Sequence, residues 1–364
     1  MYKKEKIYIA GPECFYTGGP ELLRVMKART ENLGMGVTLP NDNPLDMENP
    51  DLQKRADSIF KDLETIMFDT TGIIADLEAY RGSEPDSGTI YEIGMAYAEG
   101  YKCFGYTRDK RNLYWKDQKY RLVNGEILDE HGEVAPYPDL PFAPTIIGST
   151  TIIEGDYDDC LKAYMLAVEE DHKNAGRRYT YESKMDAPTL APSDKIRVYL
   201  AGPERYARDG REKLAEMKKK CEEYGFEVYT PLDWAEGVVE IETDSPYTKA
   251  VNLFDNFQQH VRNVDVIIAN LNDYRGYECM NDASFECGMG FQLGKKLYAY
   301  MDDARPMIER IPHYGEEAEF RDMTGANVEN FNYPLNLMFS SSMKVFEGKF
   351  EEVIDEIAKD IVKE

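Results

Sequence analysis

An internal duplication constrains the fold of this chain more than any other feature of its sequence. The stretch K-I-Y-I-A-G-P-E at residues 6–13 returns as R-V-Y-L-A-G-P-E at residues 197–204. A later stretch, G-I-I-A-D-L at 72–77, returns as V-I-I-A-N-L at 266–271. Landmarks that recur in the same order indicate two copies of one domain. The length of 364 residues agrees, because one hydrophobic core rarely spans so many.

The organisation that we predict has two similar domains and a linker. We expect the first domain at residues 1–172, a polar linker at 173–194 and the second domain at 195–364. Each half reads as four strands alternating with four helices, which predicts an α/β fold with a doubly wound, flavodoxin- or Rossmann-like parallel sheet. Two such copies commonly pack about a pseudo-two-fold axis, as a fused symmetric dimer does. Residues 106–144 are expected to be a polar insertion of surface loops or a flap.

Composition excludes several classes of partner. The formal net charge of -25 would repel nucleic-acid backbones and anionic membranes. No segment approaches the roughly 20 apolar residues of a membrane span, and the N-terminal residues lack the apolar core of a signal peptide, so we expect a cytoplasmic protein. The 6 cysteines form no C-x-x-C pair and the 4 histidines show no metal-ligand spacing. We therefore expect no metal and no cofactor.

An acidic loop follows the predicted strand at residues 72–77. It places Asp86 near the N-terminus of a predicted helix and Glu92 about one turn inside it. A helix N-terminus holds a nearby carboxylate in its ionised form, and a fixed, ionised carboxylate suits nucleophilic attack on a sugar carbon. The alternative is that Asp86 and Ser87 only cap the helix while Glu92 faces solvent. This segment alone favours that alternative.

Four motifs in order are more specific than any one of them. They are K-I-Y-I-A-G-P at 6–12, D-L-x-x-I at 62–66, I-I-A-D-L-x-x-Y-R-G-x-E-P-D-S-G-T-x-x-E-I-G-x-A at 73–96, and N-L-M at 336–338. This combination resembles the nucleoside 2-deoxyribosyltransferase family. The resemblance covers both halves nearly end to end, apart from the linker and the insertion after Tyr106.

The resemblance implies a reaction and the residues that carry it. In that family a glutamate attacks the anomeric carbon of a deoxynucleoside and expels the base, and a second base then takes the sugar. Glu92 matches the nucleophile, Tyr8 the tyrosine that positions it, and Asp62 the aspartate that handles a proton on the base. Asp86 matches the residue that holds a sugar hydroxyl. Taken singly, Tyr8 is equally explained by core packing and Asp62 by a solvated helix face.

Further substrate contacts are expected around the first turn and the acidic loop. The resemblance implies that Gly11, Ser87 and Gly88 line the substrate site. Phe15 and Tyr16 follow the first turn and are candidates to stack on the base, with packing an equal alternative. The substrates implied are deoxynucleosides and free nucleobases.

The two halves are not equivalent at the motif positions. The second half keeps a tyrosine and a glutamate at Tyr199 and Glu286, but it has lost the other acids. Three aspartates of the first half become residues that cannot act as acids: Asp62 becomes Asn256, Asp76 becomes Asn270 and Asp86 becomes Met280. The second half therefore looks inactive as a transferase.

The first half has lost a complementary element. Family members complete each site with an Asn-x-Met from a neighbouring subunit, and only the second half has it, at Asn336 and Met338. We therefore predict one working site per chain, in which Asn336 binds a sugar hydroxyl and Met338 confines Glu92. The alternative is that Asn336 caps a turn and Met338 belongs to the core. Relatives form dimers and hexamers, so further homo-oligomerisation of the chain is possible on this view.

The substrate and the second step remain open between alternatives. Relatives that cut nucleoside 5′-monophosphates have a serine where Asp86 stands, and a carboxylate there would repel a phosphate dianion. Asp86 therefore favours an unphosphorylated nucleoside, whereas Arg81 beside the site could bind phosphate. Besides base transfer, two functions fit the same residues. One is an N-glycosidase, in which water resolves the intermediate, and the other is a non-catalytic nucleoside or nucleotide sensor.

Overall fold

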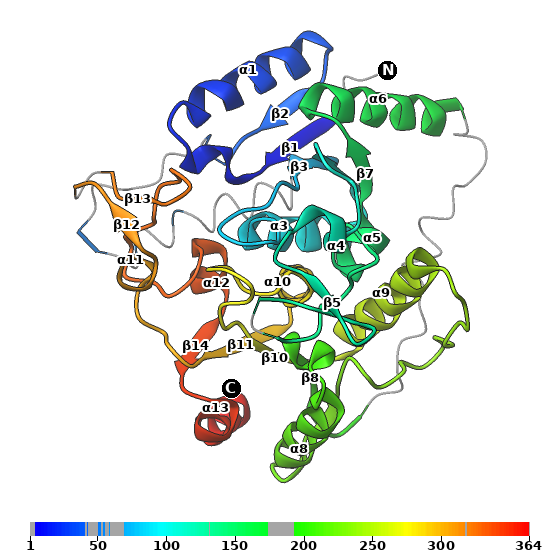
Figure 1. Cartoon of the computed structure of the whole chain (residues 1–364), viewed down its shortest axis with the longest axis vertical. Coiled ribbons are helices and arrows are strands. Elements are labelled where there is room, and N and C mark those ends of the chain that lie inside the picture. Colours follow the sequence, from blue (N-terminus) through cyan, green and yellow to red (C-terminus); the bar gives the residue numbers. More distant parts are fainter. Residues whose placement is uncertain are drawn as a thin grey trace.

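Two five-stranded parallel sheets form the framework of the chain (Figure 1). The computed structural model describes residues 4–40, 42, 50–51, 54, 58, 69–130, 132–173, 193–316 and 319–363. The first sheet has the order β2-β1-β3-β4-β7, with β1 (Lys6–Ala10), β2 (Gly36–Thr38), β3 (Gly72–Asp76), β4 (Lys102–Thr107) and β7 (Thr151–Glu154). The second has the order β14-β11-β10-β8-β9, with β8 (Arg197–Ala201), β9 (Glu227–Tyr229), β10 (Val266–Asn270), β11 (Lys296–Met301) and β14 (Lys344–Glu347). The predicted doubly wound fold is confirmed.

Each sheet has one strand more than the four that we predicted. The additional strands are β7 and β14, which run directly into the last helix of each half. Each has only four residues, and their outer residues are exposed. Such a short edge strand shows too little hydrophobic alternation to be read from sequence.

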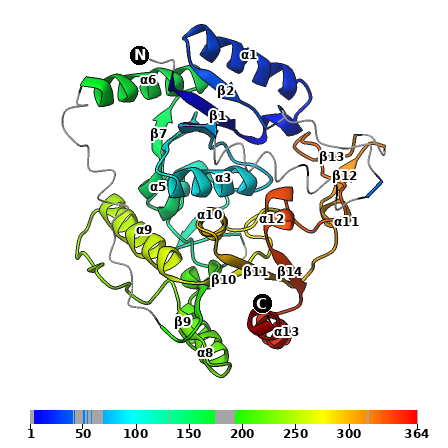
Figure 2. The ribbon, with the colours of Figure 1, turned by 180° about the vertical axis from the view of Figure 1, so that it is seen from behind.

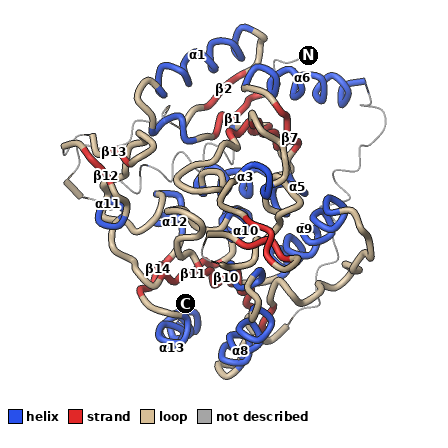
Figure 3. The backbone as a smooth tube through the Cα atoms, in the orientation of Figure 1, coloured by secondary structure: helices blue, strands red, loops and turns tan. Residues whose placement is uncertain are grey.

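Helices cover both faces of each sheet. In the first half they are η2 (Pro12–Phe15), α1 (Gly19–Asn32), α3 (Ser87–Ala98), α4 (Leu113–Lys116), α5 (Pro144–Ser149) and α6 (Tyr157–Lys173). In the second half they are η3 (Pro203–Tyr206), α8 (Gly210–Glu222), α9 (Pro246–Asn263), α10 (Asn281–Gln292), α11 (Met307–Arg310), α12 (Leu337–Ser342) and α13 (Phe350–Lys363). Helices α1 and α6 lie on the outer side of the first sheet, and α8 and α13 on the outer side of the second (Figure 2). Helices α3, α5, α9 and α10 lie between the two sheets (Figure 3).

The hydrophobic core is divided by the strands. In β1, Ile7 and Ile9 belong to the outer core under α1 and α6, whereas Tyr8 and Ala10 belong to a central core. This follows from the alternation of side chains along a strand. Strand β8 divides in the same way. Since the central core contains residues of both halves, each half buries its inner face against the other.

The most extensive contact between the two halves is that of α3 with α10. Every residue of α3 is buried. A Cβ added at Gly94 of α3 would lie 2.3 Å from the carbonyl oxygen of Phe285, and one added at Gly288 of α10 would lie 2.0 Å from that of Tyr91. Gly94 and Gly288 occupy equivalent positions of the two copies, as a pseudo-two-fold contact requires. Only glycine allows the two backbones to approach this closely.

The insertion at 106–144 crosses to the other half instead of forming only surface loops. It contains α4 and a hairpin of β5 (Arg121–Val123) and β6 (Glu126–Leu128). Arg275 of the second half donates to Val134 O at 3.0 Å and forms an ion pair with Asp129. A segment of the second half, which contains β12 (His313–Tyr314) and β13 (Arg321–Asp322), contacts the first half in turn. In this segment Asn327 N donates to Phe15 O at 2.7 Å. Because both segments are polar, their sequences do not indicate that each one contacts the other half.

Two predictions about the chain's layout are not tested by these contacts. The predicted linker at 173–194 lies outside the described residues except at its two ends, and the boundaries of the domains at 1–172 and 195–364 stay predictions. Within the ranges that are described, none of the helices is both long enough and apolar enough to cross a membrane.

The contact at Gly288 yields a test of the interface. We predict that Gly288→Ala lowers the free energy of unfolding by about 1–3 kcal/mol, because the new methyl group meets the backbone of Tyr91 and not a side chain that can move. Gly290→Ala in the same helix is the control, since its methyl group meets the side chains of Ile267 and Leu297 and no backbone atom. Urea unfolding of both variants checks this. Equal stability of the two would contradict the close-packed interface.

Candidate active site

A tyrosine and a glutamate meet at the carboxyl ends of the first sheet. Tyr8 points from β1 into the central core, and Glu92 lies on α3, which follows β3 after the acidic loop. The hydroxyl of Tyr8 donates to Glu92 Oε1 at 2.6 Å. Both side chains are buried. The structure therefore holds the Glu92 carboxyl group in one orientation, away from bulk solvent.

A cavity of about 110 Å³ lies against this pair. Residues of both halves line it, among them Tyr8, Gly11, Phe15, Asp86, Gly88 and Glu92 from the first half and Glu329, Asn336 and Met338 from the second. Small-molecule pockets usually measure roughly 300–1,000 Å³. The volume that the described residues enclose is therefore closer to that of a sugar than to that of a whole nucleoside. The convergence of the two halves on one hollow is what the shared-site prediction requires.

Three of the residues predicted for the site do not line this cavity or fall outside the described residues. Asp62 falls outside the described residues. The hydroxyl of Ser87 donates to Glu278 of the second half, so this residue stabilises the interface. Tyr16 packs edge-on against Tyr80, with ring centroids 6.3 Å apart, while Phe15 both lines the cavity and stacks on Tyr80 at 5.9 Å. Both alternatives for Phe15, packing and site lining, thus hold at once.

Asp86 caps α3 and also faces the cavity. Its Oδ2 accepts hydrogen bonds from Thr89 N at 2.8 Å and from Thr89 Oγ1 at 2.6 Å. Its Oδ1 is buried and has no hydrogen-bond partner among the described residues. Burial raises the pKa of Asp86, and the hydrogen bonds from Thr89 offset this only in part. Burial therefore opposes the ionising effect that we expect from the helix N-terminus.

Asn336 and Met338 reach the same cavity from α12. Asn336 Oδ1 accepts a hydrogen bond from Met338 N at 3.0 Å and so caps this short helix. The Asn336 side chain also lies directly over Gly88, where an added Cβ would come within 2.7 Å of Nδ2. Met338 is part of the central core. The structural roles considered as alternatives are therefore present, and both residues line the cavity as well.

The equivalent position in the second half is occupied by an ion pair. Tyr199 donates to Glu286 Oε1 at 2.9 Å, as Tyr8 does to Glu92. Arg205, however, donates from Nη1 to Oε1 at 2.8 Å and from Nη2 to Oε2 at 2.6 Å. This arginine stands where the first half has Cys14. A carboxylate held by two guanidinium hydrogen bonds is poorly available as a nucleophile.

The equivalent site of the second half is also filled by the side chain of Asp282, which α5 of the first half covers. Thr145 of α5 donates from its backbone N and Oγ1 to Asp282 Oδ1, at 3.1 and 2.7 Å. Asp282 stands where the first half has Gly88, and α5 stands where the second half supplies α12. A side chain thus occupies the position that Gly88 leaves open in the first half. The filling of this site by Arg205 and Asp282 was not predicted from the sequence motifs.

A pair of carboxyl groups near the first turn explains another difference between the halves. Glu13 and Asp76 lie next to each other, and burial together with the charge of Glu13 raises the pKa of Asp76 to about 8. In the second half, Asn270 Nδ2 donates to Glu204 Oε1 at 2.6 Å. A pair of neighbouring carboxyl groups is thus replaced by an amide–acid hydrogen bond. Glu13 and Asp76 are not among the residues that line the Glu92 cavity.

Arg81, which we considered as a phosphate ligand, forms its hydrogen bonds across the interface between the halves. Its Nε donates to Asp322 Oδ2 at 2.8 Å, and its Nη2 donates to Asn327 O at 2.7 Å. A third contact, from Nη1 to Glu278, is longer at 3.4 Å. Arg81 does not line the Glu92 cavity. The structure thus gives no support to phosphate binding by this residue.

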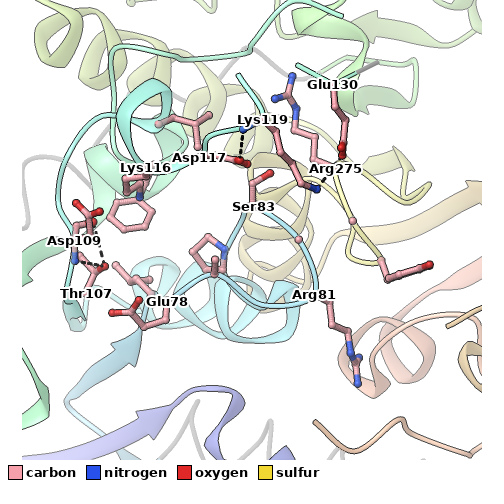
Figure 4. A pocket seen from close by; sticks show the side chains of 18 of the residues that line it. Glu78, Arg81, Ser83, Thr107, Asp109, Lys116, Asp117, Lys119, Glu130 and Arg275 are labelled. Carbon is pink, nitrogen blue, oxygen red and sulfur yellow. Dashed lines mark hydrogen bonds and ion pairs between the residues drawn. The ribbon is translucent and has the colours of Figure 1, made fainter. Parts of the chain in front are cut away.

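A larger hollow of about 930 Å³ lies between the insertion and the second half (Figure 4). Two of its charged side chains, Lys119 and Glu130, form an ion pair at 2.9 Å. Lys116 donates to Pro141 O at 2.7 Å, and burial lowers the pKa of Lys116 to about 8. Arg81 also lines this hollow, but its side chain points away from the other labelled side chains (Figure 4). Among the described residues, those predicted to be catalytic or to bind the sugar or base do not line this hollow, so the smaller cavity at Glu92 is the candidate site.

Comparison with known proteins assigns the chain to a family. The sequence model of the nucleoside 2-deoxyribosyltransferase family matches residues 7–153 and again residues 198–338, which together make up well over half of the chain. The chain therefore belongs to the nucleoside 2-deoxyribosyltransferase family, with two copies of the family domain in tandem. The predicted family and the predicted duplication are both confirmed.

Solved structures provide further similarities. A 2-desoxiribosyltransferase from Leishmania mexicana is 28% identical, with 45% of this chain and 97% of its own covered and a TM-score of 0.36. A 2-deoxyribosyltransferase from Bacillus psychrosaccharolyticus is 18% identical, with 43% and 90% covered and a TM-score of 0.28. A conserved protein from Enterococcus faecalis V583 is 19% identical, with 46% and 99% covered and a TM-score of 0.30. No curated protein sequence matches the chain significantly.

Proposed function

We propose that this chain transfers 2-deoxyribose between nucleobases through a covalent intermediate on Glu92, at one site per chain. The observation that carries the proposal is the hydrogen bond from Tyr8 to Glu92 inside a cavity that residues of the second half close. Membership of the nucleoside 2-deoxyribosyltransferase family supports the class of reaction. The substrates are free deoxynucleosides and nucleobases, and the reaction uses no cofactor.

The reaction is a double displacement with retention at the anomeric carbon. A Glu92 oxygen attacks C1′ while the N-glycosidic bond breaks and its electron pair passes to the base nitrogen. Asp62 supplies the proton that makes the base a better leaving group. A nitrogen of the incoming base then attacks C1′ from the opposite face, expels the Glu92 carboxylate and returns a proton to Asp62. Tyr8 keeps Glu92 aligned by its hydrogen bond to Oε1.

The arrangement of charges favours an unphosphorylated nucleoside. Asp86 faces the cavity with a buried oxygen, and a phosphate dianion placed there would meet a second negative group or an acid with no cationic partner. Arg81 directs its hydrogen bonds to the interface, which removes the principal argument for a phosphate site. Gly11 and Gly88 line the cavity without side chains of their own.

We further propose that the second half is a scaffold for the first site and not a second transferase site. The bidentate ion pair of Arg205 with Glu286 and the filling of the cavity by Asp282 support this. Asn336 and Met338 are the contribution of the second half: the amide to a sugar hydroxyl and the thioether to the confinement of Glu92.

Base exchange tests the reaction directly. Incubation of a deoxynucleoside with a second free base is expected to give the exchanged deoxynucleoside, because the base resolves the glycosyl intermediate. Glu92→Gln should lower the rate by at least about 1,000-fold, since it removes the nucleophile. Chromatography of both nucleosides and of free deoxyribose measures the outcome. Free deoxyribose with and without the second base would show hydrolysis in place of transfer, and binding without either product would show a sensor.

Substitution of Asn336 tests the shared site. We expect Asn336→Ala and Asn336→Ser to lower kcat/KM by about tenfold or more, because a sugar hydroxyl loses a partner worth roughly 1.4 kcal/mol or more. Serine still caps α12, so the loss in that variant does not come from helix fraying.

The matched control lies in the second half. Replacing Glu286 alone would leave a buried, unpaired guanidinium and cost roughly 3–5 kcal/mol of stability. The control is therefore the double variant Arg205→Met with Glu286→Gln, for which we expect nearly unchanged turnover. Equal losses from the Asn336 variants and from this double variant would contradict the scheme of one working site.

A further inference from the structure

The cavity contains one carboxyl group that the family motifs did not include. Glu329 comes from the segment between β13 and α12 of the second half, and it lines the same hollow as Asp86, Glu92 and Asn336. Its residue is 8% exposed. Its Oε2 is buried and has no hydrogen-bond partner within the described part of the chain.

The interface does not account for this carboxyl group. The charge of Arg81 lowers the pKa of both Asp86 and Glu329, but its hydrogen bonds go to Asp322, to Glu278 and to the carbonyl of Asn327. Oε2 of Glu329 has no partner among the described residues, and burying such an acceptor is as costly as losing a hydrogen bond.

Asp86, which lines the same cavity, also has one carboxyl oxygen without a hydrogen-bond partner among the described residues. Oδ1 of Asp86 and Oε2 of Glu329 are both buried, and both residues line the cavity, one from each half of the chain. Burial, partly offset by Arg81 and reinforced by Asp86, raises the pKa of Glu329 to about 8. Near neutral pH the two carboxyl groups therefore retain a proton, so together they can both accept and donate a hydrogen bond.

We propose that Glu329 binds a hydroxyl group of the substrate's sugar, and that Asp86 and Glu329 together restrict the site to sugars whose 3′ and 5′ hydroxyls carry no phosphate. A deoxyribose has these two free hydroxyls, and each can meet one of the two unpartnered oxygens. The second half then supplies a carboxyl group to the sugar in addition to the amide of Asn336. This inference deepens the proposed function and rests on it for the identity of the sugar.

Binding without turnover tests this contact. In the Glu92→Gln protein, calorimetry would give the Kd of a 2′-deoxynucleoside and of its analogues that lack either the 3′ or the 5′ hydroxyl. Glu329→Met, of similar length but apolar, is expected to weaken binding of the parent nucleoside about tenfold. For one of the two analogues the effect of Glu329→Met should fall below about twofold, because the partner hydroxyl is already missing. The other analogue should still show the full effect.

A second variant tests the exclusion of phosphate. At pH 9, above the raised pKa of Glu329, Glu329→Gln removes a negative charge but keeps a hydrogen-bonding group, so the preference for the nucleoside over its 5′-monophosphate or 3′-monophosphate should fall about tenfold or more. Glu309→Gln, an exposed change on α11, is the control and should leave every Kd unchanged. Thermal unfolding of each variant confirms that it is folded before binding is compared.

The outcomes separate this inference from the proposed function. If Glu329→Met weakens both analogues and the parent equally, Glu329 does not bind the sugar, even where base exchange proceeds. If it spares one analogue while the unmodified enzyme exchanges no bases, the contact stands and the transferase proposal falls. Failure of the Glu92→Gln protein to bind the deoxynucleoside would also overturn the inference.

Discussion

The contact between α3 and α10 is the constraint on which the rest of the molecule depends. Glycines at 94 and 288 bring the two helix backbones together, and the central core forms around them from residues of both halves. Since α3 carries Glu92, the same contact sets the distance between the nucleophile and the second half. Helix α12 then reaches α3, where the side chain of Asn336 lies over Gly88. The candidate site is therefore a consequence of how the halves pack.

The duplication explains how the two copies came to differ without loss of the fold. In a symmetric dimer each change alters both sites, whereas a tandem chain can specialise each copy. The tyrosine–glutamate pair survives at Tyr199 and Glu286, but Arg205 binds the carboxylate that a transferase would need. The second copy keeps the residues that it contributes across the interface. On our proposal these are Glu329, Asn336 and Met338, so its conserved architecture serves the other copy's site.

Sequence predicted the parts of this structure that depend on local pattern and repetition. The duplication follows from the repeated motifs and the parallel sheets from the alternation of strands and helices. The meeting of Tyr8 with Glu92 follows because parallel strands end at one edge of a sheet. It missed what depends on contacts between distant segments. Residue 329 has no motif of its own, and only the folded interface brings it to Asp86. The contacts of the two polar segments with the opposite halves, the role of Ser87 in the interface and the Arg205 ion pair were hidden for the same reason.

The central claim, one working site in a chain with two family domains, is tested most directly by counting covalent sugars. A 2′-fluoro-2′-deoxynucleoside slows both displacements by destabilising the oxocarbenium-like transition state, and a good leaving base lets the intermediate accumulate. Intact-mass and peptide analysis then locate the sugar. The account predicts one sugar per chain, attached to Glu92. Two sugars per chain, or a sugar on Glu286, would contradict it.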